Sequence, residues 1–328
     1  MKKILIIRFS SFGDVVQAIN AARELKSTYP NSKITWVTKK MFSEFLDSEP
    51  SIDKVVTIEG DFSNSVLSLA NYISSQNFDL IYDAHRNLRT FLLKLLLIIK
   101  LKLSNWVYRP KSRLKRFFLF QFKINLLPNP FFAMDSYIFP IKKYLNGSKS
   151  RTFEINYGKV NVDRFDFVGT PYLLFAPSAA WEMKRWPMKY WEELINKLSI
   201  KFKIVLVGGS NDQFIKDLYS SSNPNVIDLS GKTTFLETFF LVENASYTLS
   251  ADTGVIHVAE LLRKKGGHLF GPTAFGRTKT KDIKLFEADL PCRPCTKDGS
   301  GKCSRKIYQE CMALLKPNNV EEDILNRA

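Results

Sequence analysis

The feature that most constrains the fold of this chain is a repeated alternation of short apolar runs with stretches of helical periodicity. In the first half, strand-like runs lie at residues 3–7, 34–38, 55–58 and 80–83, and helix-like stretches lie at residues 15–25, 41–46 and 66–75. The alternation restarts after a polar segment, with strand-like runs at residues 172–176, 203–207, 226–228 and 247–249 and helix-like stretches at residues 188–199 and 212–219. Strands that alternate with helices form parallel sheets covered on both faces. We therefore expect an α/β protein with two domains, residues 1–165 and residues 166–328.

The length and charge of the chain agree with this division and favour anionic partners. Its 328 residues exceed what one hydrophobic core usually holds. The 48 Lys and Arg residues against 32 Asp and Glu residues give a formal net charge of +16. Such a charge attracts nucleic acid, phosphorylated ligands or an acidic membrane surface, and charge alone does not choose among them.

The N-terminal region and the most apolar segment both favour a cytoplasmic protein. Arg8 interrupts the first apolar run and no small-residue cleavage site follows it, so we expect no signal peptide. Residues 91–103 form the most apolar segment, but they are only about half a membrane span and include Lys94, Lys100 and Lys102. This segment is expected to lie on a membrane surface rather than to cross the bilayer.

A long basic stretch surrounds that segment. Residues 84–134 contain eleven Lys or Arg residues and no Asp or Glu, with large apolar side chains between them. Each basic group near an anionic leaflet contributes about 1 kcal/mol, so the stretch favours peripheral contact with the inner face of the inner membrane. A solvated charged face is the alternative for any one lysine, and RNA is an alternative occupant of the whole surface.

Residues 249–273 predict a binding site for a phosphorylated ligand. Asp252, Thr253 and Gly254 stand where a strand passes into a helix, and a helix start offers unpaired N–H groups and positive dipole charge to an anion. His257 follows in the first turn, and a Gly-Pro-Thr turn at residues 271–273 ends the next apolar run. Hydroxyl, imidazole and glycine backbone are expected to converge on a diphosphate. The alternative is that the first triplet is only a helix cap and the second only a turn.

Two further loops contain candidate chemistry. Residues 177–187 concentrate two cations and two indoles between a strand and a helix, and Lys184 is expected to act as a point charge on phosphate. Its alternative role is that of a solvated lysine beside a core Trp186. Asp14 lies at the entry to the first helix, where the dipole favours an ionised carboxylate that can accept a proton. An ordinary acidic residue of a first helical turn is the alternative.

Two other patterns need separate interpretation. Residues 228–234 lack the first glycine of a P-loop, so Thr234 is expected to cap a helix instead. The four cysteines of the chain lie near its C-terminus at Cys292, Cys295, Cys303 and Cys311. Their spacing leaves a tetrathiolate zinc site and free thiols open, and disulfides are disfavoured in a cytoplasmic protein.

Taken in order, the motifs RFSSFGDVV, PSAAWEMKRWP, DLSGKT, SADTGVIHVA and LFGPT resemble glycosyltransferase family 9, the ADP-heptose:lipopolysaccharide heptosyltransferases. The resemblance implies a GT-B fold, in which two Rossmann-like domains face a central cleft. The acceptor would bind the N-terminal domain and the nucleotide sugar the C-terminal domain, and no metal cofactor would be required.

The resemblance also implies roles for single residues. Asp14 matches the general base that deprotonates an acceptor hydroxyl for inverting attack on the anomeric carbon. The residues that match donor-binding positions are Lys184, Asp252, Thr253, Gly254 and His257, together with Ser178, which stands where the family usually has Gly. The candidates for contact with the acceptor, a lipid A–Kdo type molecule, are Ser11, Gly13, His85, Arg86 and Arg89.

Three hypotheses of function follow. The first is an inverting transferase that moves heptose from ADP-heptose to the inner core of lipopolysaccharide. The second is a GT-B transferase with another nucleotide sugar or another surface-glycan acceptor. The third is a non-catalytic module that binds anionic ligands; nucleic acid is not the expected partner. Whether the C-terminal helix near residues 320–325 packs back on the N-terminal domain stays open.

Overall fold

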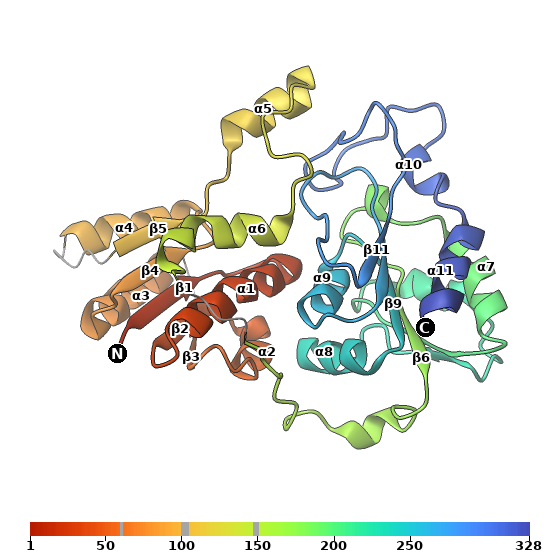
Figure 1. The fold of residues 1–328 in the computed structure, drawn as a ribbon, viewed down its shortest axis with the longest axis horizontal. Helices are drawn as coiled ribbons and strands as arrows, with labels where there is room; N and C mark the ends of the chain where they lie inside the picture. The colour runs from red at the N-terminus through yellow and green to blue at the C-terminus, as the bar shows by residue number, and fades with distance from the viewer. Residues whose placement is uncertain (60–61, 100–104, 147–150) are drawn as a thin grey trace. The chain divides into compact units, whose positions relative to one another are not determined.

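The computed structural model describes residues 1–59, 62–99, 105–146 and 151–328, so Lys100 and Lys102 of the basic stretch lie outside the described residues. The chain forms two compact units, each with its own parallel sheet (Figure 1). The first unit comprises Met1–Ser112 and Met134–Lys159, and the second comprises Arg113–Ala133 and Val160–Ala328. The expected α/β class is confirmed. The sequence pattern did not indicate that residues 113–133 belong to the second unit.

The first unit is a five-stranded parallel sheet with the strand order β3-β2-β1-β4-β5. The strands are β1 (Lys3–Ile7), β2 (Lys33–Lys39), β3 (Lys54–Ile58), β4 (Leu80–Asp83) and β5 (Asn105–Tyr108). The helices are α1 (Phe12–Thr28), α2 (Ser43–Asp47), α3 (Phe62–Gln76), α4 (Leu88–Ile99) and α6 (Ala133–Ile138). The apolar side chains of β1 and β4 pack with α3 and α4 into one buried cluster.

The second unit is a six-stranded parallel sheet with the strand order β11-β10-β9-β6-β7-β8. The strands are β6 (Tyr172–Ala176), β7 (Lys203–Leu206), β8 (Val226–Asp228), β9 (Tyr247–Ala251), β10 (Gly266–Leu269) and β11 (Ile283–Phe286). The helices are α5 (Arg113–Phe122), α7 (Met188–Leu198), α8 (Phe235–Asn244), α9 (Gly254–Leu261), α10 (Glu310–Ala313) and α11 (Pro317–Arg327).

The strand orders define one topological switch point in each sheet. In the first sheet the order reverses between β1 and β4, and in the second between β6 and β9. Loops at the carboxyl ends of the two strands beside a switch point diverge to opposite faces and leave room for a ligand. The loops that follow these four strands contain the predicted site residues.

The C-terminal helix packs within the second unit. Helix α11 lies against α7 (Figure 1), and it also contacts β10. Val320 and Ile324 are buried in the same cluster as Trp191 of α7, and the Tyr247 hydroxyl donates to Asp323 at 2.6 Å. This packing accounts for the apolar face of α11.

The local structure agrees with some of the sequence expectations and differs from others. Thr234 caps α8 as predicted: its hydroxyl accepts from the Glu237 N–H at 3.1 Å, and the Glu237 carboxylate accepts from the Thr234 N–H. Residues 213–218 form a 3-10 helix rather than the expected α-helix. Strand β10 includes Gly267, where a Cβ would lie 2.6 Å from the Tyr247 hydroxyl oxygen. Packing against Tyr247 therefore accounts for a glycine in a central strand.

Candidate functional site

In the first unit, Asp14 lies in the first turn of α1 and is held by charged and polar partners. Its Oδ2 is 2.6 Å from a guanidinium nitrogen of Arg8 and accepts from the Ser11 hydroxyl at 2.8 Å. Its Oδ1 accepts from the Tyr137 hydroxyl at 2.7 Å and lies 3.8 Å from Nη1 of Arg109. Both carboxylate oxygens are therefore already engaged.

These partners control the ionisation of Asp14. Burial disfavours the charged carboxylate, but the positive charge of Arg8 and the Tyr137 hydrogen bond outweigh burial and hold the pKa of Asp14 well below its ordinary value. The expectation that Asp14 is ionised near neutral pH agrees with this. An anion at the start of α1 is also favoured by the helix dipole.

The predicted acceptor residues lie in the segments that follow β1 and β4, the two strands at the switch point of the first sheet. His85 and Arg86 follow β4, which is next to β1, and their backbone N–H groups donate to Asp83 Oδ1. Burial and the nearby Arg8 lower the pKa of His85 to about 3, so this imidazole is neutral. Arg89 lies over the Phe9 ring. The other two candidates are in the loop itself: Ser11 is the N-cap of α1, and Gly13 is its second residue.

Sequence reasoning missed three partners of Asp14. Arg8 ends the first apolar run, and from the sequence alone it served only as an argument against a signal peptide. Arg109 follows β5 and Tyr137 lies in α6, and neither element was predicted. The only signal in the sequence was the position of Arg8 at the carboxyl end of a strand, where ligands of parallel sheets bind.

In the second unit, Lys184 and Asp252 form an ion pair. The Lys184 Nζ lies 3.0 Å from Asp252 Oδ2, and both side chains are largely buried. The two residues meet because β6 and β9 are neighbours at the switch point and each loop leaves the same end of the sheet. Asp252 Oδ2 also accepts from the Thr273 hydroxyl at 2.8 Å. Burial disfavours the ionised form, but Lys184 and His257 overcome it and hold the pKa of Asp252 well below its ordinary value.

His257 adds a second cation to this cluster. Its Nε2 lies 3.6 Å from Asp252 Oδ1, and its Nδ1 lies 3.6 Å from Glu260 Oε2. Burial alone would lower the pKa of His257, but the two carboxylates raise it to about 9. The imidazole is therefore protonated near neutral pH. We refer to Lys184, Asp252 and His257 as the cation cluster.

The remaining donor candidates lie in the two loops that supply Lys184 and Asp252. Thr253 is the N-cap of α9 and accepts from the Val255 N–H at 3.3 Å, and Gly254 is the first residue of the helix. Ser178 is half-buried, two residues beyond the end of β6. A helix start next to two cations is a favourable environment for a diphosphate. Thr253 is thus a helix cap, and capping leaves the anion-binding hypothesis intact.

The ionisation of His257 predicts a pH dependence. Because its pKa in the folded protein is about 9, above the ordinary 6.5, its contribution to the free energy of unfolding is fully present below pH 6.5 and is lost as pH rises through about 9. We expect both this free energy and the affinity for ADP to fall over that interval. Calorimetry and chemical denaturation of the wild type and His257→Gln would measure both quantities; in the variant the alkaline loss should be much smaller. An equal alkaline loss in both proteins would contradict the assignment.

The cysteines do not support a zinc site. Among residues whose positions the structure describes, no group of three or more His, Cys, Asp or Glu side chains could hold a metal ion. Cys292, Cys295, Cys303 and Cys311 are free. The Cys295 thiol faces the Pro272 carbonyl, and burial raises the pKa of Cys311 to about 11, which keeps it a thiol. Since the described residues hold no suitable group of ligands, the zinc hypothesis is not supported.

Two parallel sheets, each with a cluster of charged side chains at its switch point, define the class of a two-unit α/β protein. The family model of glycosyltransferase family 9 (heptosyltransferase) matches residues 66–304. The chain therefore belongs to this family. The matched region includes the cation cluster, whereas Asp14 lies before it.

Individual relatives agree with this assignment. Lipopolysaccharide heptosyltransferase 1 of Pseudomonas aeruginosa is 23% identical over 338 residues, which cover 90% of this chain and 86% of the relative. Lipooligosaccharide heptosyltransferase 2 of Campylobacter jejuni is 28% identical over 149 residues, which cover 43% of this chain and 46% of the relative. The solved structure of Escherichia coli ADP-heptose lipopolysaccharide heptosyltransferase II has a TM-score of 0.75 at 18% identity and covers 99% of this chain and 98% of that one. This likeness shows the expected GT-B fold.

Proposed function

We propose that this protein is an inverting glycosyltransferase that transfers heptose from ADP-heptose to the inner core of lipopolysaccharide. The observation that carries the proposal is the cation cluster at the β6/β9 switch point, in a chain that belongs to the heptosyltransferase family. Relatives of this chain are named heptosyltransferases of lipopolysaccharide or of lipooligosaccharide. The proposal extends that chemistry to this chain.

In this reaction the acceptor hydroxyl oxygen attacks the anomeric carbon, and the bond from that carbon to the diphosphate oxygen breaks. Negative charge then accumulates on the departing ADP. We assign the stabilisation of that charge to Lys184 and protonated His257, together with the N-terminus of α9. The reaction so described requires no metal.

Asp14 is the proposed general base. Its lowered pKa makes it a weak base, so it accepts the hydroxyl proton only as the bond to ADP breaks and the hydroxyl becomes acidic. Arg8 and Arg109 hold the carboxylate in place. The basic residues that follow β4, including Arg86 and Arg89, are proposed to contact an acidic acceptor such as Kdo or a sugar phosphate.

We also propose that the protein works in the cytoplasm, in peripheral contact with the inner face of the inner membrane. No helix within the described ranges is long and apolar enough to cross a bilayer.

Helix α4 nevertheless presents an apolar face to solvent. The side chains of this face are 39% to 69% exposed: Leu88, Phe91, Leu95, Ile98 and Ile99. Their spacing places them on one side of the helix, opposite the buried Thr90, Leu93 and Leu97. Arg86, Arg89 and Lys94 add positive charge beside this face, a composition typical of interfacial helices.

A double variant tests this membrane contact. Phe91→Glu with Leu95→Glu should weaken co-sedimentation with anionic phosphatidylglycerol vesicles at least about tenfold, because each loses the burial of a large apolar side chain. The matched control is Ile200→Glu with Leu325→Glu, which makes the same charge change at exposed apolar positions of the second unit. Equal loss of binding in both variants would show that only net charge matters. A wild-type protein that dimerises through this face would also contradict the membrane assignment.

Nucleotide selectivity tests the donor. Calorimetry without added metal should show that ADP binds more tightly than UDP or GDP. Tighter binding of UDP or GDP would mean that the donor is a UDP- or GDP-sugar instead of ADP-heptose. Binding of none of the three nucleotides would favour the non-catalytic module.

A further inference from the structure

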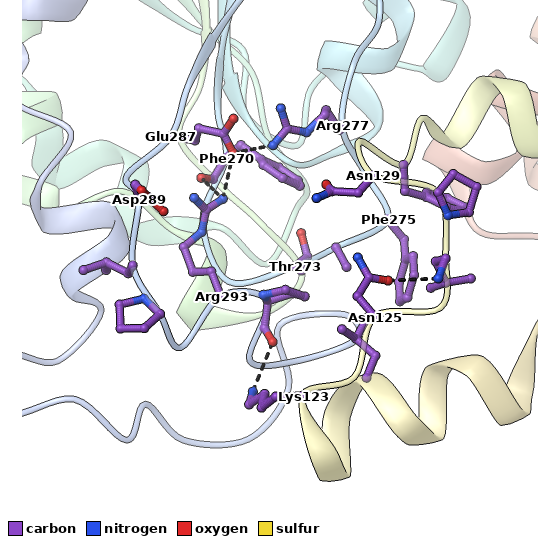
Figure 2. A pocket seen from close by; sticks show the side chains of 18 residues that line it. Lys123, Asn125, Asn129, Phe270, Thr273, Phe275, Arg277, Glu287, Asp289 and Arg293 are labelled. Carbon is purple, nitrogen blue, oxygen red and sulfur yellow. Dashed lines mark hydrogen bonds and ion pairs between the residues drawn. The ribbon is translucent and has the colours of Figure 1, made fainter.

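The second unit contains a pocket of about 340 Å³ that the proposed roles do not use (Figure 2). Three segments of the unit line it: residues 119–131, residues 270–277 and residues 287–294. The first of these comprises the last turn of α5 and the segment that follows it, and the other two follow β10 and β11. We refer to this cavity as the strap pocket.

Hydrogen bonds from basic side chains, mostly to backbone carbonyl oxygens, connect the segments that line the strap pocket. The Arg293 guanidinium donates to Gly271 O at 2.7 Å, to Phe270 O at 3.1 Å and to the carboxylate of Glu287. The Lys123 ammonium donates to Pro294 O at 3.3 Å (Figure 2). The basic side chains of the pocket thus already have hydrogen-bond partners within the protein.

The inner surface combines aromatic faces with uncommitted polar groups. Phe275 packs edge-on against Phe131 at a centroid distance of 5.3 Å. The Asn129 amide and the Asp289 carboxylate line the same cavity (Figure 2). Both side chains are exposed, and neither has a hydrogen-bond partner among the described residues. The pocket therefore offers a neutral donor and acceptor, a charged acceptor and an apolar ring, which are the groups that position small polar ligands.

One wall of the strap pocket is also a wall of the cation cluster. Thr273 lines the pocket, and its hydroxyl donates to Asp252 Oδ2 at 2.8 Å. Gly276, in the same loop, lies so close to Asp252 that a Cβ there would come within 1.9 Å of Oδ1. A ligand in the pocket is therefore separated from the cation cluster by a single loop.

We propose that the strap pocket binds a hydroxylated sugar ring of one of the two substrates. Hydroxyl groups of a sugar both donate and accept, which matches Asn129 and Asp289, and the C–H faces of the ring match Phe275. A diphosphate is disfavoured because the three cations of the lining, Lys123, Arg277 and Arg293, are bonded to carbonyl oxygens or to Glu287, while Asp289 adds a negative charge. This inference rests on the proposed function, and the sugar belongs either to the donor or to the acceptor glycan.

The test is direct calorimetric binding with Asn129→Ala combined with Asp289→Ala. The three probes are ADP, ADP-heptose and a deacylated Kdo-containing oligosaccharide. The variant should bind one of the two sugars roughly tenfold more weakly, the effect of losing two hydrogen-bonding groups, and bind ADP as the wild type does. Weaker binding of ADP-heptose alone assigns the pocket to the donor sugar, and weaker binding of the oligosaccharide alone assigns it to the acceptor.

The matched control is Asn196→Ala with Asp217→Ala, which removes one exposed amide and one exposed carboxylate elsewhere in the same unit. Unchanged binding of both sugars in the pocket variant would overturn the proposal, and so would an equal loss of ADP binding, which would indicate a nucleotide pocket. Because the readout is binding, failure of the wild type to transfer heptose would refute the proposed function without deciding the role of the pocket.

Discussion

Replacement of Asp14 by Asn is expected to lower kcat by about 10²–10⁴-fold, the usual contribution of a general base. The change keeps the size of the side chain and the oxygen that accepts from the Tyr137 hydroxyl at 2.7 Å, but it removes the charge that faces Arg8. Affinity for ADP should stay within about twofold of the wild type, since the cation cluster lies in the other unit. Initial rates of ADP release and calorimetric ADP binding measure the two effects separately.

The control for this variant is Asp47→Asn. Asp47 is an exposed carboxylate at the end of α2 in the same unit, so its replacement makes the same change in net charge. It should leave both kcat and ADP affinity unchanged. If Asp14→Asn retains more than about a tenth of the wild-type kcat, Asp14 is not the general base.

Replacement of Lys184 by Ala has the largest expected effect on donor binding. The loss of a charged partner to phosphate should weaken ADP binding by about 10- to 100-fold. The same change leaves the buried Asp252 carboxylate without its nearest cation, so the free energy of unfolding should fall by about 3 kcal/mol, the lower end for a broken buried pair because His257 remains beside it. Calorimetry and chemical denaturation measure the two losses.

A second substitution separates these two effects of Lys184. In Lys184→Ala combined with Asp252→Asn, the unpaired charge is removed while the oxygen that accepts from Thr273 is kept. The free energy of unfolding should return most of the way to the wild-type value, but ADP binding should stay weak. Recovery of ADP binding in the double variant would mean that Lys184 is a structural partner of Asp252 and not a phosphate ligand.

The parts of the fold that the sequence predicted well are those with clear periodicity. Strands β1, β4 and β6 lie where the apolar runs predicted them, because a strand buried on both faces is a continuous apolar run. Helix α4 was missed for a related reason. Its solvent face is as apolar as its buried face, so it lacks the amphipathic pattern by which a surface helix is recognised.

The candidate site was only partly predictable from sequence. The loops with Asp14, Lys184 and Asp252 stood out because each follows an apolar strand, which is a local signal. The contacts of Asp14 with Arg109 and Tyr137, by contrast, join residues far apart in the chain. The order of the strands, in which β4 lies beside β1 and β5 beside β4, brings Arg109 to the edge of the sheet at which Asp14 lies, and helix α6 supplies Tyr137.

The central claim is tested most directly by incubation of the purified protein with ADP-heptose and a Kdo-containing lipid A acceptor, followed by mass spectrometry of the acceptor and measurement of released ADP. The account predicts an acceptor heavier by one heptose and one ADP released for each heptose transferred, with the product bond inverted at the anomeric carbon. Binding of ADP-heptose without transfer, or transfer only from a UDP- or GDP-sugar, would contradict it.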